Sequence, residues 1–179
     1  MQPWYIVTEK FSPQDGAKWD SYIKFSGLTQ LTELVSLDNL LCTRVLKEVK
    51  ASYWDHIVNE DCMLDYFTDL PFLLGEIDSF EGRNLLGVYR NPQSPPPPPA
   101  AAGIKFEFIG YDLTERDGST SALTNCEGFP DAFSNPELSE FGLLTSFSRA
   151  AEVQVELHRA YPEEHHANCD RWAVFRALL

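Results

Sequence analysis

Residues 85–109 read LLGVYRNPQSPPPPPAAAGIKFEFI, and this stretch dominates the interpretation of the chain. Five consecutive prolines favour polyproline II and cannot enter the interior of a helix or a sheet. Residues 85–90 are a short apolar run, and residues 104–109 alternate apolar and charged side chains, as strands do. The sequence therefore predicts two strands joined by a Pro-rich surface loop, residues 91–103, and we expect an antiparallel pair.

Two more strands are expected towards the C-terminus. Asp117 and Gly118 are typical of a turn, after which residues 121–126 return as a strand. Residues 171–178 are aromatic and β-branched, which favours a final strand. Residues 40–50 are ambiguous, because their apolar spacing fits a short helix while Val and Thr disfavour one.

Three helices have recognisable starts. Ser12 and Pro13 are typical of a helix N-terminus, and this helix should end near Gly27. A second helix is expected from Thr68 or Asp69, and a third from Ser146 or Ser148. The apolar faces of these two helices comprise Leu70, Leu73, Leu74 and Ile77 in one and Ala150, Val153, Leu157 and Ala160 in the other.

These elements predict one α+β domain over residues 1–179, a mainly antiparallel sheet covered by two or three helices. Residues 67–90 and 144–176 are similar to each other. Each reads apolar-Thr-polar-apolar, then a helix, a loop and a strand ending in an aromatic residue and Arg. Two interpretations stay open: a chance similarity of two amphipathic helix–strand units, or a pseudo-twofold internal repeat of such units.

The charge balance excludes several partners. Fourteen basic and 27 acidic residues give a net charge of −13, which repels nucleic acids and anionic membranes. No apolar run approaches the ~20 residues of a membrane span, and the first residues lack the pattern of a signal peptide. We therefore expect a cytoplasmic protein with no nucleic-acid or membrane partner.

The acidic residues are concentrated in one interval, residues 51–82, which contains no Lys or Arg. An uncompensated run of this kind raises the local negative potential. Trp54 lies at its start and offers an apolar contact for a partner. We predict that Trp54, Asp55, Glu60 and Asp61 are exposed and bind a basic protein. The other acidic residues of the interval are Asp65, Asp69, Glu76, Asp78 and Glu81.

Residues 161–170, YPEEHHANCD, are the densest cluster of reactive side chains. His165, His166 and Cys169 could ligate zinc together with Cys62 or His56. Adjacent histidines on extended chain point to opposite sides, however, so we favour a solvated loop whose Cys169 enters the core. Cys126 has no neighbouring His and is interpreted as a structural thiol. We expect no cofactor and no metal.

No catalytic motif is present, so the leading hypothesis is a non-catalytic acidic protein-binding module. Such a module would be an inhibitor or an immunity-type protein that masks a basic partner. A second hypothesis is a hydrolase or metal-dependent enzyme that uses residues 161–170 with His56. A third is a structural homo-oligomer.

Overall fold

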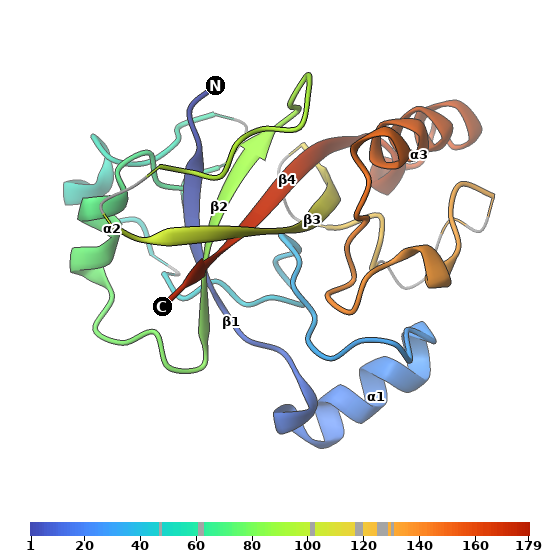
Figure 1. Ribbon diagram of the computed structural model, residues 1–179, viewed down its shortest axis with the longest axis horizontal. Helices are drawn as coiled ribbons and strands as arrows, with labels where there is room; N and C mark the ends of the chain where they lie inside the picture. The colour runs from blue at the N-terminus through green and yellow to red at the C-terminus, as the bar shows by residue number, and fades with distance from the viewer. Residues whose placement is uncertain (47, 61–62, 101–102, 117–119, 125–128, 130) are drawn as a thin grey trace.

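The computed structural model describes residues 1–179 apart from residues 47, 61–62, 101–102, 117–119, 125–128 and 130 (Figure 1). The described residues form one antiparallel sheet in the order β1-β2-β4-β3, together with helices α1, α2 and α3, so the fold is α+β as predicted. The strands are β1 Trp4–Glu9, β2 Arg83–Arg90, β3 Lys105–Glu115 and β4 Cys169–Leu178.

The predicted pairing of the two strands that flank the prolines is wrong. Strand β4 lies between β2 and β3 and is antiparallel to both, so β2 and β3 run in the same direction. Strands that run in the same direction need a long crossover connection, because the chain must return the full length of the strand. The Pro-rich segment makes that return across the sheet (Figure 1).

Residues 91–103 connect β2 to β3, and their described part is held by hydrogen bonds at its start and by packing near the end of the prolines. Arg171 Nη2 donates to the Pro92 carbonyl at 2.7 Å, and Pro99 is buried against the sheet. A Cβ placed on Gly87 would lie 2.8 Å from Pro99 Cγ. The glycine in β2 therefore makes room for the proline, and the loop packs as well as connects.

The helices begin where the capping residues predict. Helix α2, Leu70–Glu76, is capped by Asp69, and helix α3, Phe147–Ala160, is capped by Ser146. The first helix differs, because Gly16, at φ 59°, separates a 3-10 turn over Pro13–Asp15 from helix α1, Ala17–Ser26. Gly27 ends α1 in the left-handed conformation, as expected.

The sheet has a hydrophobic cluster on each face, because successive side chains of a strand point to opposite sides. Tyr5 and Phe175 belong to the cluster that includes the buried faces of the helices. Ile6 and Trp172 belong to the second cluster, to which the loop residues Val35, Leu37, Val58 and Leu143 contribute. Of the predicted α3 face, Ala150, Val153 and Leu157 are buried, whereas Ala160 is exposed.

Three local features were missed, left ambiguous or only partly located by the sequence patterns. Residues 4–9 form a strand that local sequence patterns did not indicate. Residues 40–46 form no helix; residues 40–42 belong to a turn and a bend, and Thr43 and Val45 lie beside β1, where Glu9 N donates to the Thr43 carbonyl at 2.8 Å. Of residues 121–126, Ser121 makes a single bridge to Thr114, and residues 125–126 lie outside the described residues, as do Asp117 and Gly118. In the part of the chain that the structure describes, no helix is long and apolar enough to cross a membrane.

Candidate functional site

Three of the four predicted partner-binding residues are open to solvent. Trp54 follows the 3-10 turn Ala51–Tyr53, and its side chain is 52% exposed. Asp55 and Glu60 are exposed and make no ion pair with any described residue. Asp61 lies outside the described residues. Trp54, Asp55 and Glu60 are called the Trp54 surface below.

Other acids of the interval are compensated, contrary to the expectation from sequence. Asp65 forms an ion pair with Arg44, and Glu76 forms one with Lys50 at 3.3 Å. Both basic residues precede the interval in sequence, and in the folded chain their side chains contact acids within it. The negative potential of the interval is therefore concentrated at the acids that lack such a partner.

His56 belongs to the start of α2. Its ring stacks on Phe72 with centroids 3.8 Å apart, and its Nδ1 lies 3.2 Å from Asp69 Oδ2. Asp69 Oδ1 in turn accepts a hydrogen bond from Phe72 N at 3.0 Å. These contacts position the first turn of α2 and give His56 a structural role.

Residues 161–170 join α3 to β4 and do not converge on a ligand. His166 Nδ1 contacts the Glu115 carboxylate, His165 is exposed, and Cys169 is buried at the start of β4. The His56 ring faces Phe72 and Asp69 instead of this loop. Among the described residues, no group of three or more His, Cys, Asp or Glu side chains could hold a metal ion.

The described thiols are unsuited to nucleophilic chemistry. Burial raises the pKa of Cys42 and of Cys169 to about 12, so both remain protonated near neutral pH. Both are free cysteines in the core. Cys62 and Cys126 lie outside the described residues.

A pocket of about 450 Å³ lies beside Tyr53, the residue before Trp54. Its volume falls within the range of sites that hold small ligands or single side chains of a partner. The apolar and aromatic residues that line it are Leu40, Leu46, Val49, Tyr53, Leu64 and Phe67. This pocket is called the Tyr53 pocket below.

An ion pair forms the polar wall of the Tyr53 pocket. Arg44 and Asp65 line the pocket and contact each other, and Arg44 lies over the Tyr66 ring at 5.2 Å. Arg44 Nη2 also donates to the Leu37 carbonyl at 3.3 Å. Glu48, which is exposed, adds a second carboxylate to the lining. The pocket therefore combines apolar walls with a net acidic rim.

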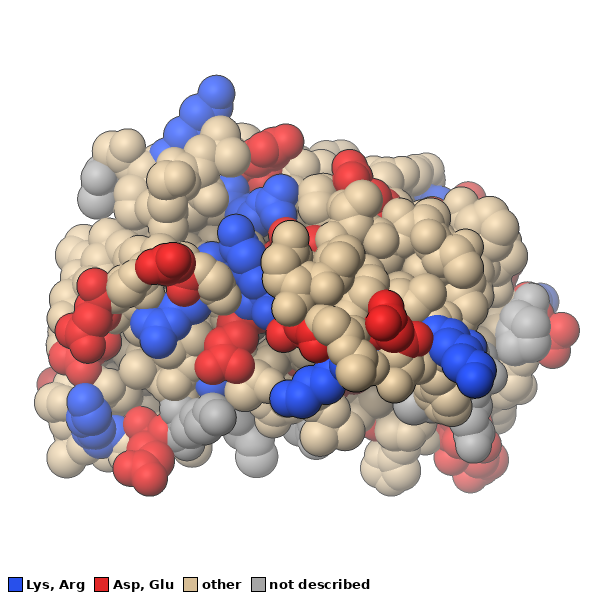
Figure 2. Space-filling view, turned by 90° about the horizontal axis from the view of Figure 1, so that it is seen from below, with Lys and Arg blue, Asp and Glu red and all other residues tan. Residues whose placement is uncertain are grey.

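Elsewhere the surface charges are mixed. The face at the bottom of Figure 1, where α1 and the α2–β2 loop lie, carries Lys and Arg side chains among Asp and Glu side chains (Figure 2). A net charge of −13 thus does not make every face of the molecule acidic.

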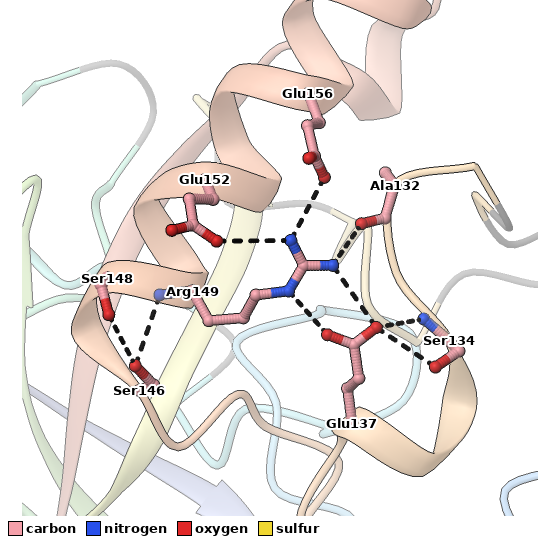
Figure 3. A network of polar contacts seen from close by, with 8 residues as sticks. All are labelled: Ala132, Ser134, Glu137, Ser146, Ser148, Arg149, Glu152 and Glu156. Carbon is pink, nitrogen blue, oxygen red and sulfur yellow. Dashed lines mark hydrogen bonds and ion pairs between the residues drawn. The ribbon is translucent and has the colours of Figure 1, made fainter.

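A polar network joins α3 to the segment before it (Figure 3). Arg149 Nε donates to Glu137 Oε2 at 2.6 Å, and Arg149 Nη2 donates to the Ala132 carbonyl at 2.8 Å. Arg149 Nη1 forms ion pairs with Glu156 and Glu152, at 3.3 and 3.6 Å. The polar groups of this network bind one another and connect α3 to residues 132–137, so we interpret the network as structural.

Sequence reasoning missed a buried carboxylate, Asp112 in β3. Asp112 Oδ2 accepts from Ser36 Oγ at 2.9 Å and from Leu37 N at 2.7 Å. Asp112 Oδ1 accepts from Ser121 Oγ at 2.6 Å and from Leu113 N at 2.9 Å. The available signal was a charged residue within the apolar run of residues 108–113, since a charged residue in such a run needs buried partners.

Comparisons with protein-family models, curated proteins and solved structures find no match for this chain.

Proposed function

We propose that this protein is a non-catalytic binding module that masks a basic protein partner through the Trp54 surface. The observation that carries the proposal is the half-exposed Trp54 side chain next to the exposed carboxylate of Asp55. A large aromatic residue usually buries its surface either in a core or in an interface, and interface hot spots are enriched in Trp.

The charges around Trp54 support a basic partner. Asp55 and Glu60 are paired with none of the described basic residues, so their field is available to an approaching cation. Carboxylates at the rim of an interface mainly accelerate association, and salt screens them over about 8–10 Å. Tyr53, which lines the Tyr53 pocket, directly precedes Trp54 in the chain. A side chain of the partner would bind in this pocket.

The proposal is tested by affinity purification from the cells that express the protein. The purification is carried out at low and at moderate salt. The variants are Trp54→Ala and the double variant Asp55→Asn with Glu60→Gln, and the matched control is Glu163→Gln with Glu164→Gln in an exposed acidic loop. We expect a basic protein to be recovered by the wild type and the control. The acid variant should slow its association several-fold at low salt, and Trp54→Ala should weaken the complex about tenfold or more. Equal recovery by all variants would overturn the proposal.

A further inference from the structure

The sheet has two halves, β1 with β2 and β3 with β4. Both halves have a similar pattern of β-bridges to residues outside the named strands. In the first half, Phe67 pairs with Tyr5 and with Ile57; in the second half, Leu144 pairs with Tyr111 and with Leu138. Each half also has a bridge between its first strand and the segment that follows, Thr8 with Arg44 and Thr114 with Ser121. The internal repeat itself stays a prediction, but these bridges define which residues occupy matching places.

The matching extends to hydrogen bonds beside the first strand of each half. Val45 N donates to the Val7 carbonyl at 3.0 Å, and Ala122 N donates to the Leu113 carbonyl at 2.7 Å. The register set by these bridges and hydrogen bonds matches five of the residues that line the Tyr53 pocket with residues of the second half. The matching pairs are Arg44 with Ser121, Leu46 with Leu123, Leu64 with Phe141, Asp65 with Gly142 and Phe67 with Leu144.

In the second half, the position that matches the Tyr53 pocket is occupied by another segment of the same chain. Leu31 and Leu34, in the segment after α1, are buried there. A Cβ placed on Gly142 would lie 3.0 Å from Leu34 Cδ1 and 3.7 Å from Leu31 Cδ2. Val35 N donates to the Phe141 carbonyl at 3.0 Å, so the segment is held by its backbone as well as by its leucines.

In the first half the matching place is the open Tyr53 pocket. Leu40 at its edge is 84% exposed and Val49 is 40% exposed. None of the described residues donates a hydrogen bond to the carbonyl of Leu64, the counterpart of Phe141. The segment that fills the second half already packs there, so it cannot also cover this pocket.

We infer that the Tyr53 pocket binds an apolar segment of the partner protein that carries two leucine-like side chains three residues apart and bends between them, as the chain does at Thr32 and Glu33. They would take the place that Leu31 and Leu34 take in the second half, and a peptide N–H of the segment would donate to the Leu64 carbonyl. Glu48 adds to the lining a carboxylate that forms no ion pair with any described residue, which favours a segment that also carries Lys or Arg. This inference rests on the proposed function for the identity of the ligand as part of a basic protein.

The test uses a synthetic peptide that copies the chain's own segment. Residues 28–36 read LTQLTELVS, and the probe is this peptide with Glu33→Lys. A second peptide keeps the lysine and replaces both leucines, Leu31→Ser and Leu34→Ser. Each is titrated into the isotope-labelled full-length protein, and amide resonances are followed by NMR.

We expect the leucine peptide to shift resonances of Thr43, Leu46, Val49 and Leu64. The serine peptide should bind at least about tenfold more weakly, because two apolar side chains no longer enter the pocket. Val49→Asp in the protein should also weaken binding about tenfold, since it places a charge at the pocket edge. Val155→Asp, at a position on α3 that is 65% exposed, is the matched control and should bind normally.

Absence of shifts, or shifts centred on Phe141 and Gly142, would overturn the inference. Equal binding by the Val49→Asp variant and the wild type would also overturn it. The original peptide with Glu33 separates this inference from the proposed function. If it binds at the Tyr53 pocket as tightly as the lysine peptide does, the pocket is a segment-binding site and the preference for a basic partner fails.

Discussion

Arg149 and Glu137 show how one residue pair sets a local pH dependence. The hydrogen bond from Arg149 holds the pKa of Glu137 at about 2, well below its usual value of 4.5. A carboxyl group whose pKa is lowered by folding stabilises the protein above the unfolded pKa and loses that contribution as pH falls towards the folded pKa. For Glu137 this loss runs from about pH 4.5 down to about pH 2.

Glu137→Gln should therefore destabilise the protein at pH 7 by about 1 kcal/mol. This expected loss of stability is smaller than that for a buried charged hydrogen bond, because the Glu137 side chain is one-third exposed. The difference from wild type should shrink steadily at pH 4 and pH 3, as measured by urea unfolding. Glu152→Gln is the matched control, because Glu152 is more exposed and lies 3.6 Å from the same guanidinium. A difference that stays constant with pH would contradict the assignment.

At the scale of elements, the connection from β2 to β3 is the feature that sequence reasoning interpreted too simply. The strands on either side of the prolines are recognisable, one as an apolar run and the other from its alternation, but their order in the sheet depends on β4, which lies far away in sequence. A connection that returns along the sheet must be extended, and polyproline II is an extended conformation without internal hydrogen bonds. The five prolines therefore suit the path that the chain takes.

Replacement of residues 93–102 with a Gly/Ser linker of the same length, which can still make the return along the sheet, tests whether this connection contributes packing. A pure connector would change the free energy of unfolding by roughly 1 kcal/mol or less, because closure entropy varies slowly with length. Since Pro99 is buried against Gly87, we expect a larger loss, about 2 kcal/mol or more. Urea unfolding with tryptophan fluorescence measures this loss.

Gly87→Ala is the companion variant and should lower the free energy of unfolding by about 1–3 kcal/mol through overpacking against Pro99. Wild-type stability in both proteins would show that the contact contributes nothing.

At the scale of the whole molecule, the segment after α1 joins the two halves of the sheet. It begins in the first half and contacts the second, where Ser36 and Leu37 donate to Asp112 and Ser121 N donates to Asp38. Burial raises the pKa of Asp112, so its charged form is held in the interior at a cost that the four donors partly offset. The halves are thus coupled by a buried polar contact as well as by the β2–β4 pairing.

Asp112→Ala should destabilise the whole protein by about 2–4 kcal/mol, because it leaves two hydroxyl and two peptide N–H donors buried without an acceptor. The unfolding transitions measured by far-UV circular dichroism and by tryptophan fluorescence should shift together. Asp20→Ala, at an exposed position on α1, is the control. A change below about 0.5 kcal/mol, the range of ordinary surface substitutions, would show that this contact does not couple the halves.

Local chemistry in the sequence determined the helix starts at Asp69 and Ser146, the end of α1 at Gly27, the last strand and the α+β class. These features depend on capping, glycine conformation and side-chain periodicity, which act between residues close in sequence. The exposure predicted for Trp54, Asp55 and Glu60 is likewise what the structure has at those positions. Their role in binding stays a proposal.

Only the tertiary structure decided the strand order, the partners of Asp65 and Glu76, and the place of Asp112. Each depends on residues far apart in sequence that meet because the sheet forms: β4 enters between β2 and β3, and Arg44 returns to Asp65. The Tyr53 pocket belongs to the same class, because its walls come from segments before and after the Trp54 surface. Long-range packing, rather than local preference, creates both the pocket and the filled place that matches it in the second half.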